Sequence, residues 1–555
     1  IAYRFLRRLE NRVQMLADQQ VHELPGDAEA QLRIAWGLGH DDAAALRAAL
    51  DAERAVVSEE FDRLLEARRQ RQAPNALSQY WRALPDGGEP AVLRDAGFAD
   101  AESADAALRD FAQGPGVRTL SARGRSRLDH VLPLLLAAAA LSSAPAMALK
   151  RGLALLQAVL RRTSYLALLE EQPAALARLV DVTARSALLA ERLAAHPLLL
   201  DELLDSRVAA LPDEPEIIAG IDALQLPEND LEAALQQLAE YRQSCAFRIA
   251  LATLAQRQPA QASARQLATL AEAVLAACLR LVRTDIESAH GRIDRAGFAV
   301  IGYGSIGGRE FGFGSDLDLV FLHDAPLEAM SDGARPLDAS RYFARLAQKL
   351  VSLLGTVTGA GKLYEVDVRL RPDGAKGLLV STVASFGDYQ RERAWTWERQ
   401  ALVRARALAG DAAVCAAFES IRRDTLCQTR DASALRDDVV AMRRRMRGEL
   451  DRGDAARFDL KQGESGLVDL EFLLQAEVLQ RAAAEPALCE PRDTPGLLAA
   501  LGCDAELAAA HALLLARGLD CTLDQRPRLV AYDESLEGAR AVVREACLGA
   551  GLDFR

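Results

Sequence analysis

The sequence lacks the residue patterns that would indicate a zinc site, disulfide bonds or a nucleic-acid partner. Its eight cysteines show no CxxC spacing and its seven histidines do not pair with them, so we expect reduced thiols in a cytoplasmic protein. With 67 basic and 79 acidic residues, the net charge is −12. No basic field covers the whole chain, which disfavours nucleic acid and anionic membranes as partners.

The chain also lacks a convincing membrane span and a targeting signal. Its most apolar stretch, 131–149, contains two prolines and two serines, so we predict buried helices there. The opening IAYRFLRRLE has neither the apolar core nor the cleavage site of a signal peptide. Because the first residue is Ile1 rather than Met, we expect the chain to be a piece of a longer protein.

What is present is mostly helical. Residues 1–290 are rich in Ala, Leu, Arg and Glu, with apolar residues three and four apart. Helix breakers at Ala73–Asn75 and at Pro85–Pro90 predict the end of a first helical piece. Helical composition returns after about Asp411 and continues to the end, and we find no internal repeat typical of a solenoid.

The length of 555 residues, at ~150 residues per domain, predicts three or four domains. We predict a predominantly α-helical multidomain chain with one α+β domain, built on a short mixed sheet. Its expected parts are a helical tail of a preceding domain at 1–75, a helical bundle region at 76–290, the α+β domain at 291–410 and a C-terminal helical bundle at 411–555.

Three strands are predicted in the α+β region. FAVIGYG, from Phe298, reads as a strand that enters a tight turn, and Leu317–Leu322 and Leu363–Leu370 are the next two candidates. The third alternates between apolar and polar residues, as a half-buried strand does. Its apolar side is expected to hold Tyr364, Val366, Val368 and Leu370, and its polar side Glu365, Asp367, Arg369 and Arg371.

Three carboxylates are expected to converge at the ends of these strands. Asp316 and Asp318 are two residues apart, so both side chains emerge on one face of the strand, about 7 Å apart, while Leu317 and Leu319 face the core. Asp367 can then lie beside them. Three converging carboxylates repel one another unless a cation neutralises them, and oxygen ligands favour Mg²⁺ or Mn²⁺. The alternative is that the two aspartates only solvate the end of a strand.

A glycine-rich turn precedes the first two carboxylates. GYGSIGGREFGFGS allows close approach of the backbone to a ligand, with N–H groups directed at phosphate oxygens. It matches neither the dinucleotide-binding pattern nor the P-loop. Together with the DxD strand and a later strand aspartate, it indicates metal-assisted nucleotidyl transfer, in which two metals clamp the attacking and leaving oxygens.

These residues resemble the nucleotidyltransferase superfamily of the polymerase-beta type, and more closely the glutamine synthetase adenylyltransferase family. The resemblance is carried by GYGSIGGREFGFGSDLDLVFLHD, YEVDVRLRPDGAKGLLVS and AWTWERQALVRARALAGD. It extends into the helices through RFLRRLENRVQML, RTSYLALLEEQPAALARLVDVTARS, HPLLLDELLD and DLKQGESGLVDLEFLLQ. Full-length members carry two nucleotidyltransferase domains, but SDLDL occurs once here. The resemblance therefore implies the carboxy-terminal, adenylylating half, preceded by the helical tail of the other half.

The resemblance implies transfer of AMP from ATP to a tyrosine hydroxyl of each glutamine synthetase subunit, with release of pyrophosphate and silencing of the synthetase. ATP is then the co-substrate and Mg²⁺ or Mn²⁺ the cofactor. Glutamine synthetase and a PII signal protein are the implied partners, and glutamine is the implied effector. The family usually has Lys at the position of Ser305, so one cation expected near the phosphates is missing.

The site residues follow from the pattern and the resemblance together. Asp316 and Asp318 are expected to hold both metals, and Asp367 to hold the second metal and help take the proton of the tyrosine hydroxyl. Gly304, Ser305 and Ser315 are expected to bind the triphosphate. Arg369 and Arg371 would neutralise the phosphates or the departing pyrophosphate, or alternatively pair with Glu365.

Further charged residues have a functional and a structural interpretation. Glu398, Arg404 and Arg406 are read on one helix, facing the cleft or forming surface ion pairs, while Leu402, Ala405 and Leu408 pack inward. Asp469 and Glu471 either reach the nucleotide or complement the start of a helix. His323 is more simply a packed residue than a catalytic one.

Three alternative functions are kept open. The chain could be a de-adenylylating, phosphorolytic half, although AWTWERQALVRAR argues against this. It could also be a uridylyltransferase relative. A non-catalytic helical scaffold that binds a signal protein is the third, supported only by Ser305.

Overall fold

The computed structural model describes residues 5, 9, 13, 24–54 and 76–555, with gaps at 161, 201–202, 204–211 and 228. Most of RFLRRLENRVQML, the predicted breaker at Ala73–Asn75 and part of HPLLLDELLD lie outside the described residues. The chain divides into two compact units, Ile1–Gly88 and Glu89–Arg555. Helices dominate the described residues of both units and a small mixed sheet lies in the second, so the predicted fold class is confirmed.

The first unit contains helices α2 (Ala28–Leu38) and α4 (Ala76–Ala83). Helix α2 begins where the Asp27 carboxylate accepts a hydrogen bond from the Ala30 amide at 2.9 Å, and it ends at Gly39 in the left-handed region (φ 85°). Its small core is formed by Leu9, Val13, Ile34, Ala35, Leu46 and Leu50. The break predicted at Pro85–Pro90 is confirmed, because α4 ends at Ala83.

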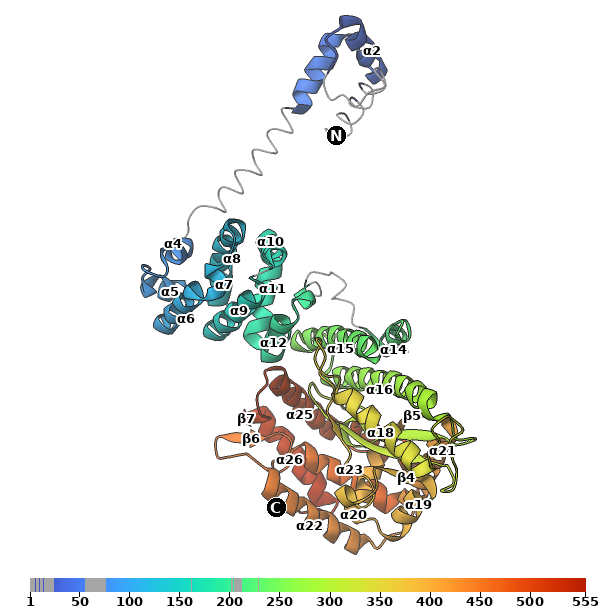
Figure 1. Cartoon of the computed structure of the whole chain (residues 1–555). Coiled ribbons are helices and arrows are strands. Elements are labelled where there is room, and N and C mark those ends of the chain that lie inside the picture. Colours follow the sequence, from blue (N-terminus) through green and yellow to red (C-terminus); the bar gives the residue numbers. More distant parts are fainter. Residues whose placement is uncertain are drawn as a thin grey trace. The chain divides into compact units, whose positions relative to one another are not determined.

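The second unit begins with a series of packed helices (Figure 1). They are α5 (Pro90–Ala96), α6 (Ala101–Gln113), α7 (Pro115–Arg118), α8 (Ala122–Ala140), α9 (Pro145–Val159), α10 (Thr163–Glu171), α11 (Pro173–Arg185), α12 (Ala187–Ala195), η1 (Pro197–Leu199), α14 (Glu214–Asp222), α15 (Leu231–Leu254) and α16 (Ala260–His290).

The apolar stretch 131–149 forms parts of α8 and α9, so the buried helices predicted there are confirmed. Leu132, Leu135 and Leu136 of α8 are fully buried, so their apolar surface packs against other helices. Helix α8 ends at Ala140, before Ser142. Among the described residues, no helix has the length and apolar character needed to cross a bilayer.

The sheet consists of β1 (Phe298–Gly302), β2 (Leu317–His323), β3 (Val366–Asp367), β4 (Val380–Thr382) and β5 (Arg406–Gly410). The strand order is β3-β2-β1-β5. Strand β4 pairs with β2 at Phe321–His323, farther along β2 than the pairing with β3. Strand β1 is antiparallel to β2 and β5, whereas β3 and β4 are parallel to β2. The first two predicted strands are confirmed.

Helices cover both faces of this sheet, which explains why β1 and β2 are largely apolar, with Asp318 and His323 as the polar residues of β2. On one face Phe298 stacks on Phe321 and on Phe343 of α18 (Ala339–Gly355), with ring centroids 5.9 and 5.8 Å apart. Helix α18 lies beside α16 over this face (Figure 1). On the other face Val320 and Leu322 pack against α19 (Val383–Glu392) and the helices that follow.

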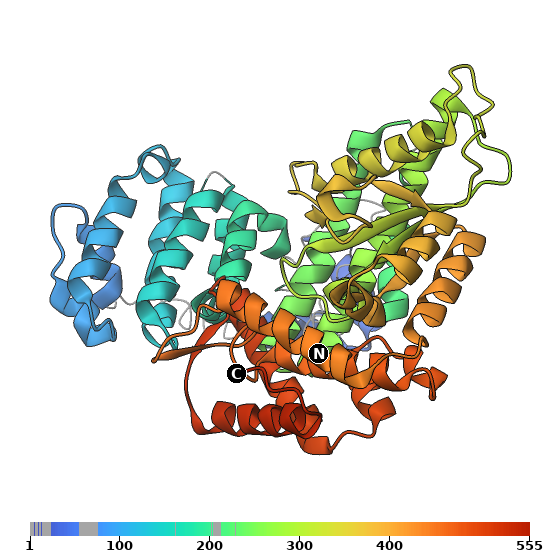
Figure 2. The same cartoon turned by 90° about the horizontal axis from the view of Figure 1, so that it is seen from below.

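Those following helices complete the unit. They are α20 (Thr396–Arg404), α21 (Ala412–Leu426), α22 (Ala432–Leu450), α23 (Leu467–Arg481), η4 (Pro486–Cys489), α24 (Thr494–Leu501), α25 (Ala505–Leu523) and α26 (Glu534–Gly549), with a two-stranded ribbon of β6 (Arg457–Asp459) and β7 (Leu529–Ala531). Figure 2 shows them running along both the earlier helices and the sheet, and α25 contacts α12, α15 and α16. Their side chains share one hydrophobic core with the sheet face that carries Val320 and Leu322.

Two predictions about the extent of elements are wrong. The third strand pairs only over Val366–Asp367, because the chain then curls and the Arg371 guanidinium donates to the carbonyls of Val368, Ala375 and Gly377. The predicted helix through WERQALVRARAL ends at Arg404, and Arg406 starts β5 instead. Leu402, Ala405 and Leu408 are nevertheless buried, as expected.

Candidate active site

The three predicted carboxylates line one cavity of about 420 Å³. Asp318 on β2 and Asp367 on β3 are direct partners in the parallel register, and Asp316 immediately precedes β2. Leu317 and Leu319 are fully buried on the opposite side of the strand. Strand alternation therefore places the two aspartates of the DxD motif as the sequence predicted.

The carboxylates do not share one electrostatic environment. Burial, followed by the negative charge of Asp367, raises the pKa of Asp318 to about 6, while the nearby Lys461 ammonium acts in the opposite direction. Hydrogen bonds from the Arg369 side chain hold the pKa of Asp367 below its ordinary value, with Nε 2.8 Å from Oδ2. Crowded carboxylates of this kind are stabilised by a cation.

The oxygen ligands of this wall suit a divalent cation such as Mg²⁺. Among the described residues, no group of three or more His, Cys, Asp or Glu side chains is arranged to hold a metal ion. The Asp367 carboxylate is engaged by Arg369, so a metal would have to share it with the guanidinium.

The glycine-rich turn brings backbone up to this wall. After β1 the chain forms the short helix α17 (Gly304–Gly307). Gly304 has φ 54°, and a Cβ atom there would lie 2.4 Å from Oδ2 of Asp318, so only glycine fits. Ser305 and Ser315 both line the cavity. The turn thus does more than leave room for a ligand, because it also leaves room for the carboxylate.

A buried ion-pair network closes the floor of the cavity. Arg404, at the end of α20, lies 2.6 Å from Glu310 and 2.8 Å from Glu471, and its side chain is 5% exposed. Glu310 also accepts a hydrogen bond from the Thr494 amide at 2.7 Å. His511 lies 3.8 Å from Glu310, and burial lowers its pKa. The alternative that Arg404 forms a surface ion pair is therefore wrong.

Other residues singled out in the sequence lie away from this cavity. Glu398 accepts hydrogen bonds from the Tyr389 hydroxyl and the Trp395 amide, both at 2.8 Å, and so caps α20. Arg406 pairs with Glu272 at 2.7 Å. Arg371 is committed to backbone carbonyls and does not line the cavity. The predicted pairing of Arg369 with Glu365 is replaced by its pairing with Asp367.

The two acidic residues of α23 have different roles. Asp469 is buried and lies 2.6 Å from Arg443 and 2.7 Å from Arg447, so it anchors the helix start and does not face the cavity. Glu471 lines the cavity through its pairing with Arg404. His323 is buried and stacks on Phe343, with ring centroids 4.6 Å apart, which fits the packing interpretation.

Sequence reasoning missed the cations that the C-terminal helices bring to the cavity. Lys461, between β6 and α23, and Arg528, between α25 and β7, both line it. The only signal for Lys461 was its place at the start of a glycine-containing loop. No local pattern in the sequence placed Arg528, because its approach depends on how the helices pack.

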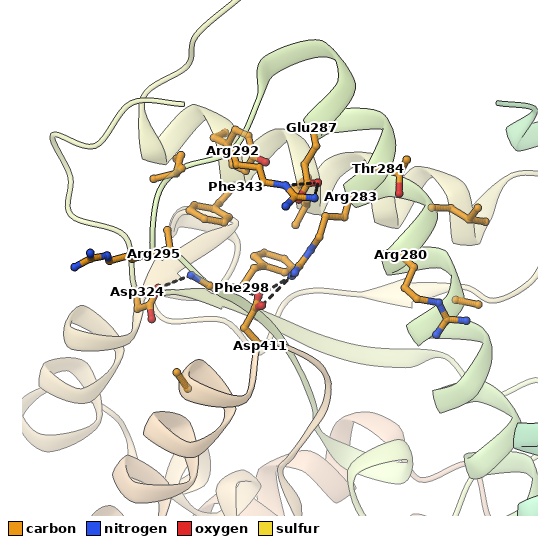
Figure 3. Close-up of a pocket in the computed structure, with 18 of the residues that line it drawn as sticks. Arg280, Arg283, Thr284, Glu287, Arg292, Arg295, Phe298, Asp324, Phe343 and Asp411 are labelled. Carbon is orange, nitrogen blue, oxygen red and sulfur yellow. Dashed lines mark hydrogen bonds and ion pairs between the residues drawn. The ribbon is translucent and has the colours of Figure 1, made fainter. Parts of the chain in front are cut away.

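A larger cavity lies elsewhere, at the beginning of β1 (Figure 3). It has a volume of about 940 Å³ and is lined by several arginines from α16 and the segment after it. Arg283 pairs with Asp411 at 2.7 Å and Arg292 with Glu287 at 2.6 Å, as Figure 3 shows. Arg280 lies 3.6 Å from Asp222. These three arginines of the cavity are thus paired with carboxylates.

Comparison with known proteins identifies relatives over the whole chain. The family model of glutamate-ammonia ligase adenylyltransferase matches residues 176–421, and that of GlnD PII-uridylyltransferase matches residues 1–65. All of the chain aligns with a bifunctional glutamine synthetase adenylyltransferase/adenylyl-removing enzyme of Stenotrophomonas maltophilia (strain R551-3), at 59% identity over 60% of that protein.

Relatives from other bacteria carry the same name. All of the chain aligns at 58% identity with 60% of the protein from Xanthomonas axonopodis pv. citri (strain 306). For the protein from Thioalkalivibrio sulfidiphilus (strain HL-EbGR7), 90% of the chain aligns at 44% identity with 54% of it. The chain thus spans about 60% of the length of the most similar of these relatives.

Proposed function

We propose that this chain is part of a bifunctional glutamine synthetase adenylyltransferase/adenylyl-removing enzyme, and that it transfers AMP from ATP to a tyrosine hydroxyl of glutamine synthetase subunits. The observation that carries the proposal is the cavity in which Asp316, Asp318 and Asp367 meet a Gly-Ser turn and several cations. A site of this composition suits a nucleoside triphosphate and a divalent metal.

We infer that the chain is the adenylylating, carboxy-terminal half of such a protein. Support comes from the similarity of AWTWERQALVRAR to that half. The match to the uridylyltransferase family model at 1–65 precedes the adenylyltransferase match, as expected for the helical tail of a preceding domain. The location in the cytoplasm belongs to the same proposal.

The transfer forms a bond between the tyrosine oxygen and the α-phosphorus of ATP and breaks the bond from that phosphorus to pyrophosphate. Asp367, kept anionic by Arg369, accepts the proton of the incoming hydroxyl. Arg369, Lys461 and Arg528 lie along the cavity and neutralise the departing pyrophosphate.

Asp316, Asp318 and Asp367 would hold Mg²⁺ or Mn²⁺, which when bound neutralises phosphate charge and orients the triphosphate. Gly304, which lies against Asp318, and Ser305 and Ser315, which line the cavity, would then border the phosphates. The cation that Ser305 does not supply is supplied by Lys461 from the C-terminal helices.

The proposal is tested with the full 555-residue chain, ATP, Mg²⁺ and unmodified glutamine synthetase, followed by intact mass of the synthetase subunit. We expect an AMP-sized gain with the unchanged chain and none with Asp316→Ala. Asp388→Ala, an exposed aspartate outside the cavity on α19, is the matched control and should retain the gain. A gain that survives Asp316→Ala would overturn the assignment of the site.

The same assay separates the alternatives. A uridylyltransferase would use UTP in place of ATP, and a de-adenylylating half would remove AMP from modified synthetase when phosphate is added. A scaffold would show no metal-dependent ATP binding. The regulatory partners, a PII signal protein and glutamine, are proposed on the family resemblance, and their effect is measured as a change in the rate of AMP incorporation.

A further inference from the structure

A second, smaller cavity lies directly behind the loop that carries the first carboxylate. Its volume is about 280 Å³, and its walls come from α12, α15, α16 and the segment 362–365. The loop residues Gly312–Asp316 line both this cavity and the carboxylate cavity. A group bound in one cavity is therefore one loop away from the other.

Two arginine side chains, Arg192 and Arg242, line this cavity, and their positive charges repel each other. Arg192 of α12 is half-buried in the wall, where the charge of Arg242 opposes its own and Tyr364 and Glu191 act in its favour. Arg242 of α15 donates to the Lys362 carbonyl at 3.1 Å and lies over the Tyr364 ring, 5.3 Å from its centroid. Among the residues that the structure describes, Nε of Arg242 has no hydrogen-bond partner.

The charge of these arginines is not balanced by the acidic residues of the wall. Glu365 is engaged by Lys362, and Asp316 belongs equally to the carboxylate cavity. Burial, together with the charge of Arg242, lowers the pKa of Arg192 to about 10. Half-buried guanidiniums with free N–H groups are stabilised by an oxyanion, to which they can donate two parallel hydrogen bonds.

We propose that this cavity binds a small organic anion, whose phosphate or carboxylate group is held by Arg192 and Arg242. The remaining wall is largely apolar and would accept the body of such a molecule; it includes Ala246, Leu267, Leu270, Phe311 and Leu363. A volume of about 280 Å³ suits a small metabolite.

Occupancy of this cavity acts on the loop that carries Asp316. The Gly312 amide donates to Oγ of Ser315 at 3.1 Å, and Gly314 has φ 85°, so the conformation of the loop depends on glycine. An anion behind it stabilises or shifts that conformation and thereby the position of Asp316. This consequence for catalysis rests on the proposed function, whereas the binding itself does not.

Binding is tested on the full chain without ATP or glutamine synthetase, by calorimetric titration with inorganic phosphate and separately with succinate at constant ionic strength. We expect one of these anions to bind, and Arg192→Gln and Arg242→Gln each to weaken its Kd at least tenfold. Arg280→Gln, in the cavity at the start of β1, should leave the Kd unchanged. The phosphate and carboxylate arms show which group the site prefers.

Lys461→Gln distinguishes this cavity from the nucleotide site. If the Kd for the anion depends on Lys461 and not on Arg192 or Arg242, the anion occupies the nucleotide site and the proposal fails. It also fails if neither anion binds the unchanged chain. Because an arginine variant can misfold, a second measurement uses the unchanged protein: phosphate or succinate should protect Arg192 and Arg242 from phenylglyoxal, read by peptide mass. Equal modification with and without the anion would overturn the proposal.

Discussion

The two cavities at opposite ends of the sheet differ in how their charges are satisfied. In the cavity at the start of β1, Arg283 and Arg292 each have a carboxylate partner. In the carboxylate cavity, Asp318 is crowded by Asp316 and Asp367 and has no arginine of its own among the described residues. Volume alone would favour the cavity at the start of β1 as the ligand site. Unsatisfied charge favours the carboxylate cavity. Charge that the fold leaves uncompensated is thus the better guide to a site that binds a charged ligand.

The comparison is tested by one Asp→Asn change in each cavity. The change in the carboxylate cavity, Asp318→Asn, has the larger expected effect. Asp318→Asn should reduce AMP transfer by at least ~1000-fold, because it removes a charge that acts on the reacting phosphates. It should leave the free energy of unfolding unchanged or slightly higher, because burial and its acidic neighbours disfavour the ionised form. Transfer rates by intact mass and urea unfolding measure both effects. A clear decrease in the free energy of unfolding of Asp318→Asn would contradict the comparison.

The buried network of Arg404 tests the opposite case, in which charges are satisfied and their loss costs stability. Arg404→Met leaves Glu310 and Glu471 without their cation. Breaking a buried pair in this way destabilises by about 3–5 kcal/mol, measured by urea unfolding. Arg423→Met is the control, since Arg423 and Glu490 are 54% and 64% exposed, and its effect should stay below about 1 kcal/mol. Equal effects of the two changes would rule out the stabilising role of the network.

Lys461 tests whether a cation from the C-terminal helices replaces the one that Ser305 does not provide. Lys461→Gln should raise the KM for ATP about tenfold, with a smaller change in kcat, because a charge-assisted phosphate contact is worth about 1.5–3 kcal/mol. Ser305→Lys added to this variant should recover part of the loss. Lys376→Gln, on the exposed η3 turn (Gly374–Lys376), serves as the control. An unchanged KM in Lys461→Gln would show that Lys461 does not contact the nucleotide.

The smallest expected effect is the pH dependence of the stability that Asp411 contributes in the cavity at the start of β1. Burial alone would raise the pKa of Asp411, but hydrogen bonds from Arg283 and the Phe298 amide hold it below its ordinary value. Its contribution to stability is therefore present above pH ~4 and is lost as the pH falls through the lowered pKa. Asp411→Asn should cost about 1 kcal/mol at pH 7 and less at pH 3, measured by urea midpoints, while AMP transfer is retained. A cost that grows as the pH falls would have the wrong sign.

Local patterns predicted the parts of the site that lie on strands. Alternation along β2 and the register of β3 suffice to bring Asp318 and Asp367 together, and the two-residue spacing places Asp316 with them. The same reasoning failed for β5, because RARALAG has the composition of a helix and becomes a strand only by pairing with β1.

The cations and the buried network could not be found in this way. Lys461, Arg528 and His511 lie more than a hundred residues beyond the DxD motif in the sequence, and the packing of helices brings them to the cavity. Nothing in the local sequence around Glu310 distinguishes an acid that pairs with Arg404 from an exposed one. The division of the chain into four parts stays a prediction.

The hydrophobic core shared by the sheet and the C-terminal helices has a consequence for how this protein folds. Val320 and Leu322 contact that core, so a chain cut after residue 410 would expose one face of its own sheet to water. The carboxylates come from one side of this core and Lys461 from the other. We therefore expect the sheet and the C-terminal helices to fold as a single unit.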